Sequence, residues 1–219
     1  MLTNLFSIFD PNSSLNLSLN WLSMMIPILL FPKMYWFKQN KMFIFMKIMI
    51  MFLFNELKNL IKIQNWNNII IFLMLFYLII IMNFMGLFPY IFTPTSHMVI
   101  SLSMSLSIWM SIMIYGWLNK TNIMFAHLVP MGTPNLLMSF MVMIESISNF
   151  IRPGTLAIRL SANMIAGHLL LCLLGSTNSS YFILMIILIQ ILLFTLEMAV
   201  SSIQSYVFMM LSSLYSNEN

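Results

Sequence analysis

The stretch IIIFLMLFYLIIIMNFMGLFPY, Ile69–Tyr90, runs for 22 residues without a charged side chain. A helix needs about 20 such residues to cross the hydrocarbon core of a bilayer. Water-soluble proteins contain about 25% charged residues. This chain of 219 residues has only 6%, and 61% of its residues are hydrophobic. It therefore lacks the polar side chains that would cover a water-soluble fold, and we predict an integral membrane protein.

The next run along the chain raises the choice between helix and strand. The segment MVISLSMSLSI, Met98–Ile108, alternates apolar residues with Ser, as the strands of a membrane barrel do. No other segment repeats this alternation, and a single strand cannot satisfy its backbone hydrogen bonds in lipid. We therefore predict an all-α fold, with a helical hairpin formed by residues 69–90 and 98–118.

The part of the chain before this hairpin contains one apolar run and one mixed run. Residues 15–35 form a predicted first span, which Pro27 and Pro32 make imperfect because proline removes a helical hydrogen bond. Residues 38–66 mix lysines with Met, Ile and Phe. For them we predict an amphipathic helix that lies in the membrane interface, with its lysines toward the headgroups.

The last third contains two runs, residues 134–174 and 181–214, that are too long for ordinary spans. The second has 34 residues, which as a helix extend about 51 Å, whereas the hydrocarbon core is about 30 Å thick. Because no Pro or Gly interrupts it, we predict two long, strongly tilted helices in a C-terminal hairpin. Residues 1–219 then form one membrane domain with about three ordinary spans, the interfacial helix and this hairpin.

The basic residues predict the orientation of the chain. The loop at residues 90–97 has no Lys or Arg, whereas six lysines between Lys33 and Lys62 precede the first hairpin and Lys120 follows it. The positive-inside rule puts the Lys38–Lys62 region and Lys120 on one side of the membrane and the loop on the other. The first twenty residues lack the basic and apolar regions of a cleavable leader, so we expect none.

Four charged residues lie within the last two runs: Glu145, Arg152, Arg159 and Glu197. Each costs about 2.5–3.5 kcal/mol at the centre of a membrane helix, so such residues have a function or a partner. The helical repeat collects them, with further polar residues, on one face of each helix. The first face, if its helix continues past Pro153, carries Glu145, Ser148, Asn149, Arg152, Arg159 and Asn163; the second carries Gln190, Glu197, Ser201 and Gln204.

Two interpretations of these polar faces remain open. They are either a buried network that fixes helix pairing or a water-accessible, proton-conducting path. A face of more than five turns that mixes carboxylates, Arg, Asn, Gln and Ser favours the path. His168 follows Arg159 by nine residues, half a turn around the helix axis, and is expected to point elsewhere. His97 and His127 lie near predicted loops, where solvation or helix capping would explain them.

The sequence lacks the residue patterns of disulfides, metal sites, phosphate-binding loops and nucleophilic catalytic sites. The chain has one cysteine, Cys172, and three scattered histidines, which excludes internal disulfides and gives no metal-ligand cluster. No phosphate-binding loop or nucleophile–base pair is recognisable. We expect no cofactor, no nucleic-acid partner and no catalysis by this chain on its own.

Four segments of the chain carry a specific resemblance. They are NFMGLFPYIFTPT (Asn83–Thr95), AHLVPMGTPNLLMSFMVMIESIS (Ala126–Ser148), FIRPGTLAIRLSANMIAGHLL (Phe150–Leu170) and LEMAVSSIQSYVF (Leu196–Phe208). In this order they resemble the subunit a family of the mitochondrial F-type ATP synthase, also called ATPase subunit 6. Arg-Leu-x-x-Asn followed by Ala-Gly-His within a membrane helix is the most specific of these features.

The resemblance implies a stator subunit that packs its last two helices against a rotating ring of c subunits, each with one carboxylate. Two offset half-channels would connect the ring to the two sides of the membrane. The family's essential arginine falls on Arg159. Its neighbours in the path fall on Asn163, on His168 and Glu197 toward the intermembrane space, on Gln204 beside the arginine and on Glu145 toward the matrix. We add Asn149, Arg152, Ser201 and Gln190 as further candidates.

The resemblance also implies partners and a location. The partners are the c ring, the peripheral-stalk subunit b, subunit 8 and the lipid bilayer. The location is the mitochondrial inner membrane, with several spans and with basic loops on the matrix side. Two alternatives are a membrane subunit of a redox-driven proton pump and a structural subunit that conducts nothing. Redox pumps carry lysines in mid-helix, whereas every Lys here lies outside the long runs. A structural subunit would tolerate neutral residues in place of both Arg159 and Asn163.

Overall fold

The computed structural model describes residues 5–12, 17–31, 38–61, 66, 68–88, 91–129, 134, 137–176 and 183–218. Within these ranges the regular elements are helices, and no strand is formed. Among the described residues, four helices are long and apolar enough to cross a membrane: α3 (Ile69–Gly86), α4 (Met98–Asn119), α6 (Met138–Ser176) and α7 (Ile183–Glu218). The predicted class, an all-α integral membrane protein, is confirmed.

Helix α4 shows why alternating serines do not make a strand here. Each serine hydroxyl of α4 donates to a carbonyl three residues earlier in the same chain. Ser103 reaches the carbonyl of Ile100 over 2.8 Å, and Ser107 reaches that of Met104 over 3.0 Å. Because these hydroxyls find hydrogen-bond acceptors inside their own helix, they need no partner from lipid or from a neighbouring strand.

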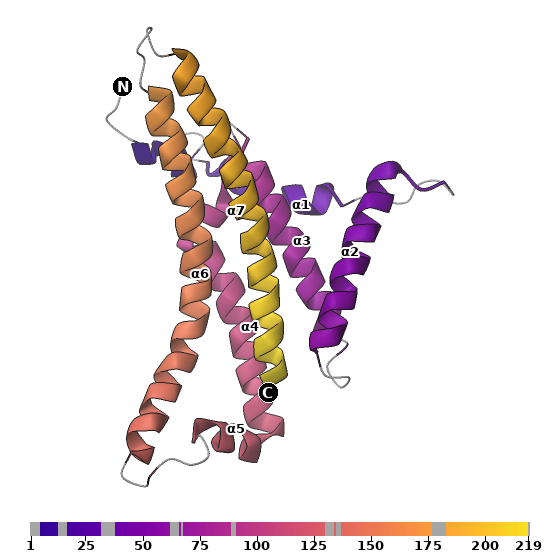
Figure 1. Ribbon diagram of the computed structural model, residues 1–219, viewed down its shortest axis with the longest axis vertical. Coiled ribbons are helices and arrows are strands. Elements are labelled where there is room, and N and C mark those ends of the chain that lie inside the picture. The colour runs from indigo at the N-terminus through magenta and orange to yellow at the C-terminus, as the bar shows by residue number, and fades with distance from the viewer. Residues whose placement is uncertain are drawn as a thin grey trace.

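Helices α6 and α7 are the two long elements of the predicted C-terminal hairpin. They contain 39 and 36 residues, which corresponds to about 58 Å and about 54 Å of helix. Helix α6 continues through the buried Pro153, so the polar face predicted from the helical repeat is uninterrupted. In Figure 1 the two helices run antiparallel, with the end of α6 and the start of α7 together at the top. Their tilt in the membrane stays a prediction.

The N-terminal part is less regular than predicted. A 3₁₀ helix, η2 (Leu19–Met25), leads into the short α1 (Ile26–Leu29), with Pro27 in the first turn of α1, where proline is tolerated. Together they form a shorter apolar helix, Leu19–Leu29. The rest of the predicted span 15–35 includes residues 15–16 and 32–35, outside the described ranges, so a complete first span stays a prediction. A further 3₁₀ helix, η1 (Leu5–Phe9), precedes it.

Helix α2 (Lys41–Leu60) is attached to the bundle by one end. Leu53 and Leu57 are buried in a cluster with Ile69 of α3 and Met209 of α7. The first half of α2 stands apart from the bundle (Figure 1), with exposed apolar side chains such as Phe45 beside exposed lysines. The interfacial position predicted for residues 38–66 stays a prediction. Lys33 and Lys62 of the basic region lie outside the described residues.

The core brings α3, α6 and α7 together. Ile79 of α3, Leu156 and Leu160 of α6 and Phe208 of α7 form one buried cluster. On the first and last of these helices a polar residue lies one turn from this cluster: Asn83 one turn beyond Ile79, and Gln204 one turn before Phe208. The same packing that buries the apolar cluster therefore brings polar side chains from three helices to one place. The remaining elements are η4 (Pro94–Ser96) and α5 (Thr121–Leu128).

Candidate functional site

A cavity of about 200 Å³ lies between α3, α6 and α7. Its wall is mainly apolar, with a polar group from each helix. The polar residues of the wall are Asn83, Asn163, His168, Glu197, Ser201 and Gln204. We call this the first cavity. The cavity is large enough for several water molecules, since one water molecule occupies about 30 Å³ in the liquid.

The polar face of α7 that the sequence predicts points into this cavity. Glu197, Ser201 and Gln204 are all buried, and their spacing of four and three residues keeps them on one side of the helix. Gln190, the fourth residue of that face, does not line the cavity. It lies near the end of α6, where a Cβ built on Gly175 would be 3.6 Å from its Nε2.

Glu197 is the most deeply enclosed charge of the four that the sequence singles out. It is 8% exposed, and neither of its carboxylate oxygens has a hydrogen-bond partner within the described part of the chain. The same holds for Nε2 of His168, which shares the cavity. Buried polar atoms without partners are rare and call for an explanation. A carboxylate and an imidazole that face one small cavity are suited to accept and pass on protons.

Glycine makes room for this carboxylate. A Cβ built on Gly167 would overlap Oε1 of Glu197 and would lie 2.7 Å from its Cδ. Real Cβ atoms do not come this close, so a larger residue would move the carboxylate. Gly167 is thus the residue of α6 that lets Glu197 of α7 reach the cavity.

If the first cavity carries protons, as the resemblance to the subunit a family implies, we expect the change Gly167→Ala to slow coupled proton transport by about tenfold to a hundredfold, since a displacement of about 1 Å at a reacting group has effects of this size. The measurement is ATP-driven proton pumping in membrane vesicles, normalised to assembled complex. The matched control is Gly154→Ala on the same helix, where an added Cβ meets nothing within 4 Å. Equal rates for the two variants would contradict the role given to Gly167.

Arg159 lies outside the first cavity. It is exposed, and no described residue forms an ion pair or hydrogen bond with it. Large apolar side chains around it on α6 are exposed as well, including Ile151 and Ile158. A cation in an exposed apolar helical face is suited to a partner that brings the opposite charge.

Asn163 connects this exposed face with the cavity. It is exposed, it lines the cavity, and its Nδ2 donates to Oε1 of Gln204 over 3.4 Å. It lies one helical turn beyond Arg159. The bond between Asn163 and Gln204 thus lies between the outer face of α6 and the enclosed carboxylate of Glu197.

The N-terminal segment approaches the same histidine. The ring of Phe9 stands edge-on to that of His168, with 6.3 Å between centroids. Nε2 of His97 donates to the carbonyl of Phe9 over 2.9 Å, and Trp21 packs on the His97 ring at 5.3 Å. His97 is therefore a partly buried packing residue rather than a solvated one. The side chain of His127 is outside the described residues.

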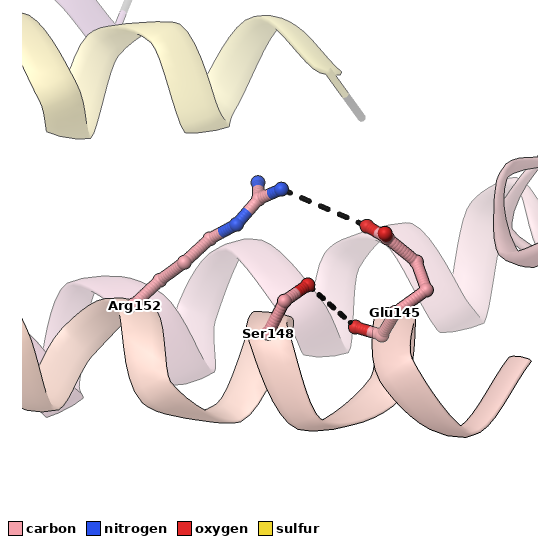
Figure 2. Close-up of polar contacts among 3 residues, drawn as sticks. All are labelled: Glu145, Ser148 and Arg152. Atoms are coloured by element: carbon pink, nitrogen blue, oxygen red, sulfur yellow. Dashed lines mark hydrogen bonds and ion pairs between the residues drawn. The ribbon is translucent and has the colours of Figure 1, made fainter. Parts of the chain in front are cut away.

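A second cavity of about 320 Å³ lies near the other end of α6. Its polar wall consists of Glu145, Asn149, Arg152 and Tyr215, and its apolar wall includes Trp109 and Trp117 of α4. Nη2 of Arg152 is 3.7 Å from Oε1 of Glu145. Figure 2 shows these two side chains reaching toward each other along one side of α6, with the Ser148 hydroxyl bonded to the backbone carbonyl of Glu145.

The two cavities are separate and lie on either side of Arg159 along α6. The second cavity takes residues 145–152 of this helix, and the first takes residues 160–170. Glu145 and His168 are 23 residues apart, about 35 Å along the helix axis. Two cavities with polar residues in their walls thus lie on either side of an exposed cation. The described residues form no continuous polar path between them.

Three residues of this site were missed by the sequence reasoning. Asn83 is buried, and neither its Oδ1 nor its Nδ2 has a described partner. As an amide in the otherwise apolar stretch 69–88, it could have been noticed. Gly167 belongs to the Ala-Gly-His motif but received no role. Tyr215 lies seven residues after Phe208, beyond the segments that carry the resemblance, and gave no signal.

The fold and the site define a class: an all-α, multi-pass membrane protein with ionisable residues in two cavities along a long helical hairpin. The family model described as "ATP synthase A chain" matches residues 17–217. "ATP synthase subunit a" of Drosophila yakuba is 55% identical over 222 residues, which cover 100% of this chain and 99% of the relative.

The same protein of Locusta migratoria is 55% identical over 223 residues, and that of Anopheles gambiae is 55% identical over 224 residues. Each alignment covers 100% of this chain and 99% of the relative. The chain belongs to the ATP synthase subunit a family, and the resemblance seen in the sequence is confirmed.

Proposed function

We propose that this chain is the proton-conducting stator subunit of the membrane sector of ATP synthase in the mitochondrial inner membrane. The observation that carries the proposal is the pair of separate cavities on either side of the exposed Arg159. The chain itself performs no nucleotide chemistry. It turns the flow of protons into rotation of a c ring, and rotation drives ATP synthesis elsewhere in the complex.

Arg159 is proposed as the fixed charge of this stator. A guanidinium remains protonated at any accessible pH. An adjacent fixed cation favours the ionised form of a ring carboxylate, whereas lipid favours the neutral form. Because Arg159 cannot relay a proton, it also keeps the two cavities from exchanging protons directly.

The first cavity is proposed as the inlet from the intermembrane space. A proton would pass by way of His168 and Glu197 to a ring carboxylate, which becomes neutral and can rotate into lipid. Asn163 and Gln204, joined by their hydrogen bond, would line the last step next to Arg159. Ser201 and Asn83 complete the polar wall.

The second cavity is proposed as the outlet toward the matrix. After nearly a full turn the ring carboxylate would release its proton past Glu145 and Asn149. Each elementary charge that crosses about 100 mV yields about 2.3 kcal/mol, which is the energy that rotation carries away. Gln190, which lines neither cavity, would serve the ring contact.

The partners and the orientation follow from the same proposal. The exposed apolar side chains of α6 and α7, for example Ile158 and Leu192, would contact the c ring, and other faces would contact lipid, subunit b and subunit 8. The basic segment from Lys38 onward and Lys120 would face the matrix, as the positive-inside rule predicts.

The direct test is purification of the chain from mitochondrial membranes in mild detergent. We expect it with a ring of small carboxylate-bearing subunits and a nucleotide-hydrolysing head, in a complex that pumps protons when ATP is added. Recovery with a redox-driven complex instead would contradict the proposal. So would a complex that pumps at the normal rate when Arg159 and Asn163 are both replaced by neutral residues, because a purely structural subunit would behave that way.

A further inference from the structure

The ion pair of the second cavity lies on a single helix. Glu145 and Arg152 are seven residues apart, close to two helical turns, so they share one side of α6. Nη2 of Arg152 and Oε1 of Glu145 are 3.7 Å apart. The side chain of Arg152 is 30% exposed, and that of Glu145 is 38% exposed. Figure 2 shows that Arg152 bends along the helix toward Glu145 rather than pointing straight away from it.

Arg152 has a second contact, on another helix. Its guanidinium carbon lies 5.2 Å from the centre of the Tyr215 ring, within the distance of about 6 Å at which a cation is attracted by an aromatic face. Tyr215 is in the last turn of α7, and Trp109 of α4 lines the same cavity. Arg152 is thus supported from α7 while it holds the carboxylate of Glu145.

The charges of α6 can be counted completely, because every residue of this helix is described. They are Glu145, Arg152 and Arg159. The first two cancel each other, so the helix presents Arg159 as its one uncompensated charge. Arg152 lies seven residues from Arg159, about 10 Å away along the axis, so the positive charge that Glu145 offsets is close to that of Arg159. Charges this close interact strongly where little water screens them.

We propose that Arg152 is the positioning and neutralising partner of Glu145: it holds this carboxylate in the wall of the second cavity and leaves Arg159 as the only net charge of α6. The inference rests on the proposed function of Glu145 and Arg159. A ring carboxylate that passes α6 then meets one cation, and Glu145 faces the outlet without leaving a net negative charge there.

The test compares four variants in the intact complex in membrane vesicles: Arg152→Gln, Arg152→Lys, Glu145→Gln and the double change. The measurement is ATP-driven proton pumping per assembled complex. We expect Arg152→Gln to slow pumping about fivefold, the size of a moderate coupling between neighbouring groups. Arg152→Lys should recover most of the rate, because it keeps the ion pair. The double variant should be no slower than Glu145→Gln alone, because it removes both charges of the pair.

Ser146→Ala is the matched control. This serine is exposed on the same helix, its hydroxyl bonds the carbonyl of Met143, and it lines neither cavity. It should pump at the wild-type rate.

The inference about Arg152 falls if Arg152→Gln pumps at the wild-type rate while Glu145→Gln is slow. It also falls if the double variant is slower than Glu145→Gln by the same factor that Arg152→Gln shows alone. If Glu145→Gln pumps normally, the outlet role of Glu145 falls and the inference falls with it. Should Arg152→Gln fail to assemble, assembly of the double variant supports the pairing, and its failure to assemble overturns it.

Discussion

Replacement of Arg159 by lysine is expected to abolish coupled proton transport as completely as replacement by alanine. Arg159 is exposed on α6, where a ring carboxylate would meet it. Lysine can lose its proton in surroundings of low dielectric, whereas arginine cannot. A lysine would therefore fail both as the fixed charge and as the barrier between the two cavities. We expect the loss of ATP-driven pumping to be about a hundredfold or more for either variant, the effect of removing a preorganised electrostatic contact.

The control for this experiment removes a cation elsewhere. Lys47 is exposed on the first half of α2 and lies in neither cavity, so Lys47→Gln should leave pumping unchanged. Complex assembly must be measured for all variants, because an assembly defect would imitate a transport defect. If vesicles with Arg159→Ala still pump protons when ATP is added, the role assigned to Arg159 is wrong.

Replacement of Glu197 by glutamine is expected to have the second largest effect. Glutamine has nearly the same shape, so it keeps the contact with Gly167, but it cannot take up and release a proton. If Glu197 carries protons, we expect coupled pumping to fall by about 10²-fold, within the range by which proton-transfer groups raise rates. Binding of the subunit into the complex should be unchanged.

Two further variants separate proton transfer from packing. The double exchange His168→Glu with Glu197→His keeps one acid and one base in the first cavity, and it should retain part of the transport. Glu56→Gln is the control for loss of a carboxylate: Glu56 of α2 accepts a hydrogen bond of 3.0 Å from Tyr206 of α7 and lies outside both cavities. A normal coupled rate in Glu197→Gln would remove this residue from the path.

The helical periodicity of the sequence was sufficient to predict part of this site. The spacing of Glu197, Ser201 and Gln204 predicts a shared face, and all three are buried against the first cavity. The period could not separate Arg159 from Asn163 in the same way. Both belong to one predicted face, yet only Asn163 reaches the cavity. Which stretch of a face meets a neighbouring helix depends on the position of that neighbour, which a one-dimensional pattern does not contain.

Contacts between distant segments were the other limit. Apart from Asn83, helix α3 is apolar on nearly every side, so its pattern does not show which neighbouring helices the side with Asn83 will meet. The contact of Phe9 with His168 joins residues 159 positions apart in the chain, and no helical period applies over that distance. Composition predicted the membrane class and the helices because these depend on the average character of each run.

The buried serines of α7 have a consequence for how this helix can change. Ser205, Ser212 and Ser213 are buried in the packed half of the helix, yet each hydroxyl donates to a carbonyl three residues earlier in α7 itself. These hydrogen bonds therefore join none of the three hydroxyls to α3 or α4. The interface selects side chains by volume, so exchange among Ser, Ala and Gly should be tolerated there over evolutionary time, whereas any branched or longer side chain would force the helices apart.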